Sequence, residues 1–221
     1  MSYTLYIGNK NYSTWSLRTW VLLKMIGVPF REQRLALYRP ESAARIRQVS
    51  PSSRLPCLHH GRSVVWDSLA IAEYLAERHP GVWPADAHAR AWARCAAAEM
   101  HSGFARLRDE LGMDVRLRRA RLPSAAAAAD IGRLVELWSE GRQRFGGDGD
   151  FLCGAFSAVD AFFCPVAFRF QTYRVALDAA AAAYARALLA LPAMQDWAAA
   201  AERESETALG FDPPGLGAQQ Q

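Results

Sequence analysis

The sequence predicts an α/β domain followed by an all-helical domain. Before residue 80, short β-like runs alternate with segments of helical spacing. After a turn-rich linker at 81–86 no run is strand-like, and Ala-rich segments with helically spaced apolar residues take over. Of the 221 residues, 51% are hydrophobic and 22% are charged, which excludes disordered, collagen-like and coiled-coil chains. A chain of this length can bury large cores without disulfide or metal support.

The first domain, residues 1–80, has a mixed order of strands and helices. The expected elements are a strand over 3–7, a helix over 15–26, a strand over 30–37, a hairpin over 56–66 and a helix over 67–78. Gly27 with Pro29 ends the first helix, and the His-Pro-Gly sequence at 79–81 ends the second. The Ser-, Pro- and Arg-rich stretch before Pro56 is expected to be a loop. A βαβ unit followed by a ββα unit predicts a thioredoxin-like fold.

The second domain, residues 87–210, is expected to be entirely helical. Helical spacing of apolar residues falls in four segments, at 87–111, 124–145, 158–174 and 179–203. The alanine runs inside these segments favour helix, because alanine is the strongest intrinsic helix former. Residues 211–221, rich in Pro, Gly and Gln, are predicted to form a mobile tail.

Charge and cysteine content exclude several classes of function. The net charge is +4, but the densest basic cluster, at 106–121, is interrupted by acids and contains no aromatic residue on which bases could stack. We interpret it as a solvated helical face and expect no nucleic-acid binding. The four cysteines lack C-x-x-C and zinc-finger spacing, so we expect reduced, mostly buried thiols and no metal site. They are Cys57, Cys95, Cys153 and Cys164.

Targeting signals are not evident in the sequence. No apolar stretch approaches the roughly 18 residues that a membrane span needs. The first ten residues lack the basic start, the longer apolar core and the cleavage site of a signal peptide. A cytoplasmic protein that does not bind membranes is therefore expected.

Four local patterns carry further information. The segment Asn11-Tyr-Ser-Thr-Trp-Ser-Leu-Arg18 lies between the first strand and the first helix, and its Ser13-Thr-Trp-Ser16 stands where thioredoxins have C-x-x-C. The others are Ser50-Pro-Ser-Ser-Arg-Leu-Pro-Cys-Leu58, Asp67-Ser68 at the start of a helix, and Phe156-Ser-Ala-Val-Asp160 with a capping-box spacing from Ser157 to Asp160. With these patterns the chain resembles the glutathione S-transferase superfamily over residues 3–210.

The resemblance implies a glutathione site in the first domain. Pro56 would be a cis-proline, and the backbone of Leu55 before it would meet the cysteinyl amide of glutathione. Asp67 and Ser68 would bind the γ-glutamyl group, and the free N–H groups of a helix N-terminus suit such a carboxylate. Arg54 stands where many family members have a Lys near the glycyl carboxylate, with which its guanidinium can pair. Ser157 and Asp160 would be structural.

The implied chemistry is activation of the glutathione thiol, which then attacks a small hydrophobic electrophile. Ser13, aligned with the first sulfur of the C-x-x-C position, is the expected catalytic hydroxyl. Serine-type members, including the zeta class, vary by a residue or two here, so Tyr12, Thr14 and Ser16 remain alternatives. Because no cysteine stands at the site, the thiol-transferase chemistry of the omega class is disfavoured.

The electrophile pocket is expected in the second domain. The segment at 98–104 is similar to one in beta-class enzymes, which implies that His101 faces the electrophile with Met100, Phe104 and Arg108 nearby. The resemblance also implies a homodimer and a role in detoxification. Other interpretations stay open. The chain can instead be a zeta-like, glutathione-dependent isomerase of the maleylacetoacetate type, or a non-catalytic scaffold.

Some of these residues also have purely structural interpretations. Ser13 and Asp67 are good helix caps. His101 is also interpreted as a surface or interface histidine. Arg18, one turn into the first helix, can cap, pair with an acid or contact glutathione.

Overall fold

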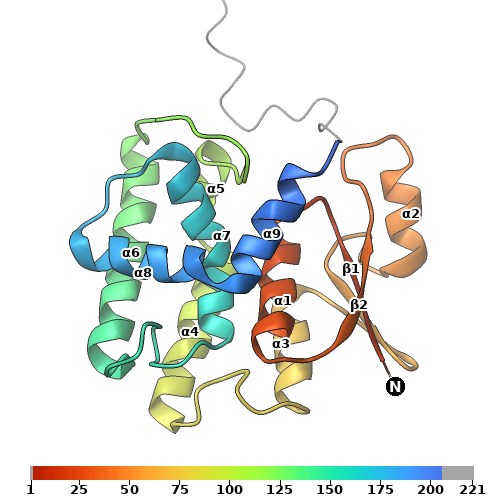
Figure 1. The fold of residues 1–221 in the computed structure, drawn as a ribbon, viewed down its shortest axis with the longest axis horizontal. Coiled ribbons are helices and arrows are strands. Elements are labelled where there is room, and N and C mark those ends of the chain that lie inside the picture. The colour runs from red at the N-terminus through yellow and green to blue at the C-terminus, as the bar shows by residue number, and fades with distance from the viewer. Residues whose placement is uncertain (1, 206–221) are drawn as a thin grey trace, which may run out of the picture.

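The computed structural model describes residues 2–205, and they form a four-stranded sheet beside a bundle of helices (Figure 1). The strands are β1 (Tyr3–Ile7), β2 (Phe30–Arg34), β3 (Cys57–His60) and β4 (Ser63–Trp66). The helices among them are α1 (Thr14–Met25), α2 (Ser42–Val49) and α3 (Ser68–Ala76). The remaining described helices are α4 (Ala87–Ser102), α5 (Ala105–Glu110), α6 (Ala125–Phe145), α7 (Ala158–Tyr173), α8 (Ala179–Ala190) and α9 (Pro192–Glu202). The predicted fold class, a thioredoxin-like part followed by an all-helical part, is confirmed.

The sheet has the order β2-β1-β3-β4, with β1 parallel to β2 and antiparallel to β3. Along β1 the side chains of Tyr3, Leu5 and Ile7 are buried, as the two-residue period of a strand requires. The expected strand over 30–37 is too long, since β2 ends at Arg34. Beyond β2 the chain leaves the sheet, and the Leu37 N–H donates a hydrogen bond of 2.6 Å to the Asn9 side chain.

The expected loop before Pro56 contains a helix, so this expectation is wrong. Helix α2 spans Ser42–Val49, and only Ser42 and Ile46 are buried along it. A helix of only eight residues with so few apolar side chains has the composition of a polar loop.

Two predicted helical segments are each divided. The segment at 87–111 breaks between α4 and α5, where Phe104 has a left-handed backbone with φ 61°. The segment at 179–203 breaks at Leu191, before the proline that begins α9. The basic cluster at 106–121 is therefore not one solvated helical face, because only its residues 106–110 are helical. Its Arg116 side chain instead turns inward and donates to the Glu204 carbonyl at 3.0 Å.

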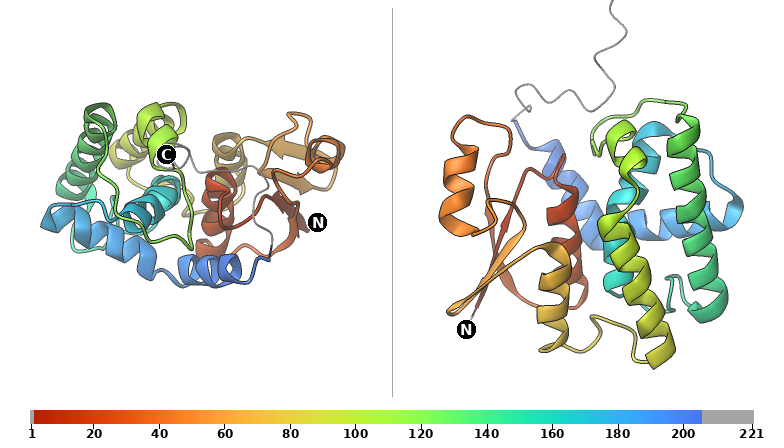
Figure 2. Two further views of the ribbon diagram at one scale, coloured as in Figure 1. Left: turned by 90° about the horizontal axis from the view of Figure 1, so that it is seen from above. Right: turned by 180° about the vertical axis from the view of Figure 1, so that it is seen from behind.

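The helical part is built around α7, whose residues are almost all buried. The Ser157 N–H and the Asp160 carboxylate form the capping box that begins this helix. Helix α7 contacts α1, α4 and α8, while α9 returns to pack against α1 (Figure 2). Helix α1 therefore lies between the sheet and the bundle, and its N-terminal end faces both.

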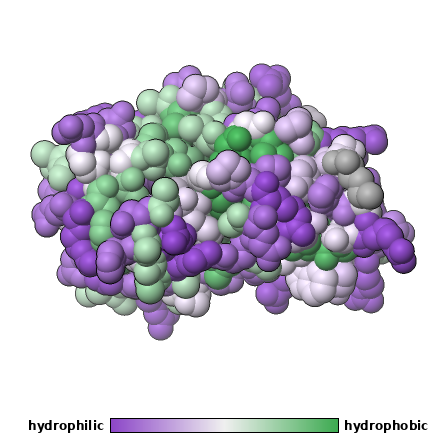
Figure 3. Space-filling view, turned by 90° about the horizontal axis from the view of Figure 1, so that it is seen from below, coloured by the Kyte–Doolittle hydropathy of each residue, from purple (hydrophilic) through white to green (hydrophobic). Residues whose placement is uncertain are grey.

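The described surface is chemically mixed. Figure 3 shows hydrophilic residues over much of one face, with hydrophobic residues in smaller groups between them. Cys57 and Cys164 are buried as expected, whereas Cys95 is exposed and Cys153 is intermediate. Within residues 2–205 no helix has the length and apolarity to cross a membrane. The predicted mobile tail at 211–221 lies outside the described residues.

Candidate functional site

A cleft with two adjoining compartments lies at the N-terminal end of α1. The Ser13 compartment, of about 380 Å³, is lined by residues that include Tyr12, Ser13, Thr14, Arg108 and Arg169. The Ser68 compartment, of about 340 Å³, is lined by residues that include Ser52, Pro56, Trp66, Asp67, Ser68 and His101. Both compartments share Trp15, Arg54 and Leu55. The cleft thus joins the predicted sulfur-chemistry position to the predicted γ-glutamyl position.

Ser13 begins α1, but its side chain caps nothing. Its N–H donates to the Asn9 carbonyl at 2.9 Å, and its hydroxyl donates to the Ser16 hydroxyl at 2.7 Å. Gly8 leaves the space for this hydroxyl, because a Cβ on Gly8 would lie 3.0 Å from Ser13 Oγ and 2.6 Å from a Leu37 methyl carbon. The capping interpretation of Ser13 is therefore wrong, and its hydroxyl borders the cleft.

The alternative hydroxyls are placed differently. Ser16 is fully buried, lines neither compartment, and accepts a hydrogen bond from the Gly8 N–H at 3.0 Å. Tyr12 and Thr14 line the Ser13 compartment, and the Tyr12 hydroxyl accepts from the Arg116 guanidinium at 3.4 Å. Ser13, Tyr12 and Thr14 can thus border a ligand, while Ser16 reaches it only through Ser13.

The start of α3 presents an unpartnered hydroxyl. The Asp67 carboxylate caps the helix by accepting from the Leu69 N–H at 2.8 Å. Ser68 is 2% exposed, and its hydroxyl has no hydrogen-bond partner among the described residues. A buried polar group left unpaired costs about 1–3 kcal/mol, so a ligand that supplies a partner is favoured here. A carboxylate suits both this hydroxyl and the N–H groups of the helix N-terminus.

The loop before β3 forms the wall shared by the two compartments. Arg54 is exposed there, and the peptide bond from Leu55 to Pro56 is cis. The cleft therefore gathers Ser13, Arg54, Leu55, Asp67 and Ser68, the residues predicted for the catalytic and glutathione-binding roles.

His101 joins the helical part to the Ser68 compartment. Its Nε2 lies 3.3 Å from a carboxylate oxygen of Asp67, and its ring meets the Trp15 ring edge-on with centroids 5.0 Å apart. Burial lowers the pKa of His101 below its usual 6.5, and Arg18 and Arg108 lower it further, whereas Asp67 opposes the shift. His101 therefore faces the predicted γ-glutamyl position and not the expected electrophile group.

The other members of that expected group are also dispersed. Met100 and Phe104 are buried in the core and line neither compartment. Arg108 lines the Ser13 compartment, and its guanidinium lies over the Trp15 ring, 5.1 Å from the centroid. Of the four residues expected to form the electrophile pocket, only Arg108 lines the Ser13 compartment.

Arg18, whose role the sequence left open, is fully buried. Its guanidinium lies over the rings of Trp15 at 4.3 Å and Phe162 at 4.8 Å, and donates to the Met100 carbonyl at 3.4 Å. Because Met100 lies in the last turn of α4, Arg18 helps to cap the C-terminal end of that helix, and it pairs with no acid among the described residues. Arg169, a residue that the sequence analysis missed, lines the Ser13 compartment and is 5% exposed. Arg169 is the one Lys or Arg in the largely apolar sequence of α7, and this was the signal that could have identified it as a functional residue.

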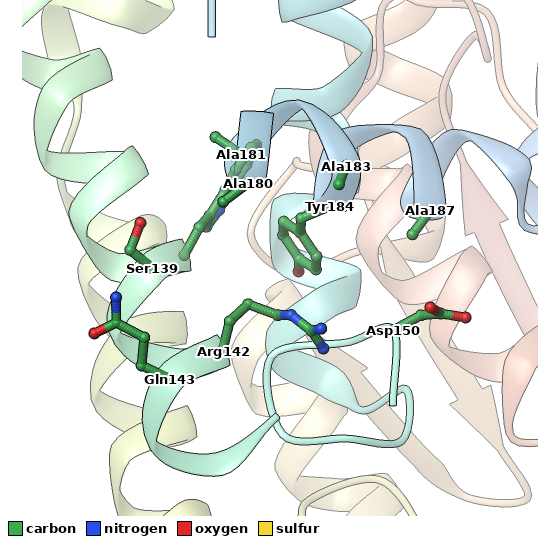
Figure 4. A pocket seen from close by; sticks show the side chains of 10 residues that line it. Ser139, Arg142, Gln143, Asp150, Ala180, Ala181, Ala183, Tyr184 and Ala187 are labelled. Carbon is green, nitrogen blue, oxygen red and sulfur yellow. The ribbon is translucent and has the colours of Figure 1, made fainter. Parts of the chain in front are cut away.

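A separate cavity of about 210 Å³ lies between α6 and α8 (Figure 4). Two of its polar groups already have structural partners. Arg142 donates to the Phe151 carbonyl at 2.9 Å, and Tyr184 donates to the Asp160 carboxylate at 2.8 Å. Within the described chain no three His, Cys, Asp or Glu side chains are placed to hold a metal ion. The cleft at α1 therefore remains the better candidate site.

Comparisons with known proteins agree with this fold. Residues 12–78 match the family model described as glutathione S-transferase, N-terminal domain. A glutathione transferase homologue from Burkholderia gl BGR1, solved with bound glutathione, is 24% identical and has a TM-score of 0.67, over 91% of this chain and 98% of that one. The theta-class enzyme from Xanthomonas axonopodis pv. citri, also with glutathione bound, is 21% identical with a TM-score of 0.67, over 94% and 99% of the two chains.

One curated relative is similar over a shorter stretch. The Caenorhabditis elegans protein named "Probable maleylacetoacetate isomerase" is 31% identical over 99 residues, which are 42% of this chain and 46% of that protein. The match thus spans less than half of the relative's length.

The fold and the cleft define a protein with a thioredoxin-like part, in which Ser13 directly precedes the first helix, joined to a helical bundle. Residues 12–78 thus match the N-terminal domain of the glutathione S-transferase family, and the chain has the fold of the solved glutathione transferases.

Proposed function

We propose that the chain is a glutathione transferase that joins the glutathione thiol to small hydrophobic electrophiles. Residues 1–80 would hold glutathione, and residues 87–210 would hold most of the electrophile. The observation that carries the proposal is the cleft whose two compartments contain the Ser13 hydroxyl and the unpartnered Ser68 hydroxyl and share the wall of Trp15, Arg54 and Leu55. Leu37, Ile46 and Met113 supply apolar walls to the Ser13 compartment.

Ser13 would act by stabilising the thiolate. A free thiol has a pKa of about 8.5 and is only a few per cent ionised at neutral pH. Lowering this pKa by about two units requires about 2.7 kcal/mol. A hydrogen bond to a charged group supplies about 1.5–3 kcal/mol, and a helix N-terminus adds up to about 1 kcal/mol. The thiol proton leaves to solvent, the sulfur lone pair forms the carbon–sulfur bond, and the leaving group departs with the electrons of the broken bond.

The proposal is tested by binding and by rate. Calorimetric titration with glutathione and with S-methylglutathione is expected to show binding of both, and no binding at millimolar concentration rejects the proposal. Ser13→Ala is expected to lower kcat/KM about 10- to 100-fold without changing the Kd of glutathione, because it removes one hydrogen bond to the thiolate. Ser102→Ala, a matched change on the exposed surface of α4, should leave both values unchanged. An unchanged rate in Ser13→Ala would transfer the catalytic role to Tyr12 or Thr14.

A glutathione-dependent isomerase is the second candidate. The similarity to the worm protein favours it, and so does the presence of Arg108 and Arg169 beside Ser13. An isomerase returns the thiol after each turnover, whereas a transferase consumes one thiol for each product formed. Measuring free thiol during turnover separates the two. A scaffold without activity would bind glutathione but would turn over neither class of substrate.

We also infer a cytoplasmic homodimer with a role in detoxification. Val64 and Trp66 on the sheet strand β4 are 38% and 44% exposed, which supports an interface near the cleft. Sedimentation of the purified protein tests this, and a monomer at micromolar concentration would contradict it.

A further inference from the structure

Three guanidinium groups from separate helices lie at and behind the Ser13 compartment. Arg18 comes from α1, Arg108 from α5 and Arg169 from α7. Arg108 and Arg169 line the compartment directly, while Arg18 lies behind the Trp15 ring. The three are close enough that Arg108 and Arg169 both lower the pKa of Arg18, and Arg108 lowers that of Arg169.

All the hydrogen bonds that these three cations donate go to main-chain carbonyls. The Met100 carbonyl accepts from both Arg18 and Arg108, and the Leu111 carbonyl accepts from Arg169. Among the described residues, no carboxylate lies within 4.0 Å of any of the three guanidinium groups. Two acids do act on the cluster from further away, but both already have partners. Asp67 raises the pKa of Arg18 and pairs with His101. Asp130 raises the pKa of Arg108 and accepts a hydrogen bond from the Leu107 N–H.

Nitrogen atoms of the cluster remain without hydrogen-bond partners. They are Nε and Nη1 of Arg18 and Nε of Arg169, in side chains that are 0% and 5% exposed. Burial and the neighbouring Arg108 lower the pKa of Arg169 to about 9. A buried charge is normally paired, because removing it from water is costly. The Ser13 compartment therefore holds positive charge that the protein itself leaves uncompensated.

We propose that the electrophile bound in the Ser13 compartment carries a carboxylate, which binds Arg108 and Arg169. This inference rests on the proposed function and narrows its substrate class from hydrophobic electrophiles to anionic ones with an apolar body. A planar guanidinium matches a carboxylate with two parallel hydrogen bonds. Asp67 and Ser68, expected at the γ-glutamyl group, line only the Ser68 compartment, which neither Arg108 nor Arg169 lines, whereas Arg54, expected beside the glycyl carboxylate, lines both compartments. The two ligands compared below carry the same glutathione carboxylates, so a difference between them comes from the added carboxylate alone.

A pair of glutathione conjugates tests the proposal by equilibrium binding. S-(4-carboxybenzyl)glutathione and S-benzylglutathione differ only in the carboxylate, and neither has a free thiol, so stabilisation of a thiolate cannot produce a difference. We expect the carboxylate to tighten binding to the wild-type chain at least about tenfold. Arg169→Gln and Arg108→Gln should each remove most of this preference, measured in each variant as the ratio of the Kd values of the two conjugates. Arg186→Gln, an exposed change of equal charge on α8, should retain the preference.

The outcomes separate this inference from the proposed function. If both conjugates bind the wild-type chain equally, or if the preference survives in both cleft variants, the anionic substrate class is wrong while glutathione binding stands. If neither conjugate binds, the proposed function fails and this inference fails with it. Binding of S-benzylglutathione reports whether each variant is folded, and Arg108→Gln alone decides the result if Arg169→Gln does not fold.

Discussion

The Ser13 hydroxyl donates a hydrogen bond of 2.7 Å to the Ser16 hydroxyl, one turn further along α1. Ser16 also accepts from the Gly8 N–H, so two donors already point at its oxygen and its own proton is available for donation. If both hydroxyls rotate, Ser16 donates to Ser13 and Ser13 donates to a bound sulfur. Ser16 is therefore a positioning residue for Ser13, without contact to the ligand.

Ser16→Ala is expected to weaken thiol activation without abolishing it. The variant removes the group that orients Ser13, so the apparent pKa of the bound thiol should rise. The loss of kcat/KM should be about 3- to 10-fold, smaller than for Ser13→Ala, since a neutral hydrogen bond contributes about 0.5–1.5 kcal/mol. The pH dependence of kcat/KM measures the thiol pKa. An unchanged thiol pKa in this variant would show that Ser16 has no part in the orientation of Ser13.

His101 and Asp67 should give the cleft a measurable pH response. Burial lowers the pKa of His101, and Asp67 opposes this by favouring the charged imidazole. Asp67→Asn removes that opposition and should lower the pKa of His101 further, while the asparagine still caps α3. NMR titration of the histidine ring protons measures the change. Glu73→Gln, an exposed change on the same helix, should not alter it, because Glu73 pairs with Arg94 instead.

The same residue makes stability depend on pH. The folded chain binds a proton at His101 less readily than the unfolded chain, whose histidine has a pKa of about 6.5. As the pH falls below about 6.5, the unfolded state takes up this proton first, so the contribution of His101 to the free energy of unfolding is lost. Replacing His101 with Gln should flatten this part of the stability profile, as measured by urea unfolding at several pH values. A profile as steep as that of the wild type would assign the pH dependence to other groups.

Glu204, close to the end of the described chain, fixes the loop before Ser13. Its carboxylate accepts from the N–H groups of Lys10 at 2.7 Å and Asn11 at 3.2 Å. Glu204→Ala leaves both buried donors unpaired and should lower the free energy of unfolding by about 2–4 kcal/mol. It should also lower kcat/KM, because the loop positions the start of α1. Glu202→Ala, an exposed change two residues earlier, should do neither.

The sequence predicted most elements of this fold because their apolar patterns are strong. Strand β1 and helix α1 match their predicted bounds within one residue at each end. Helix α2 was missed because its exposed face is polar and almost nothing on it is buried. The divisions of the long helical segments depend on a left-handed Phe104 and on Pro192, and single-residue breaks do not disturb the average spacing of apolar residues.

The candidate site was predictable where it rests on local motifs. Ser13, Asp67 and Ser68 begin helices at fixed places in the fold, so their motifs located them. The arginine cluster was not predictable, because Arg18, Arg108 and Arg169 converge only through the packing of three helices. For the same reason the expected group around His101 is dispersed. Neighbours on one helix can point into different compartments.

Asp160 provides a test of the capping box that is independent of the cleft. Its carboxylate accepts from the Leu152 N–H at 3.1 Å, the Ser157 N–H at 2.9 Å and the Tyr184 hydroxyl at 2.8 Å. Asp160→Ala leaves these buried donors unpaired and should lower the free energy of unfolding by about 3 kcal/mol or more. Asp178→Ala removes an exposed cap at the start of α8 and should cost only about 1 kcal/mol. Equal losses in the two variants would contradict a special role for the buried box.

The pH dependence of the Asp160 contribution has the opposite sign to that of His101. Complete burial raises the pKa of Asp160 from 3.8 to about 6, although the hydrogen bonds it accepts oppose the shift. Because the folded chain holds this proton more tightly than the unfolded chain, the stabilisation from protonation is full below about 3.8 and is lost as the pH rises through about 6. Asp160→Asn cannot ionise, so the difference in unfolding free energy between wild type and variant should shift in favour of the variant across this range. Urea unfolding at pH values between about 4 and 7 measures that difference, and a difference constant with pH would show that Asp160 titrates at its ordinary pKa.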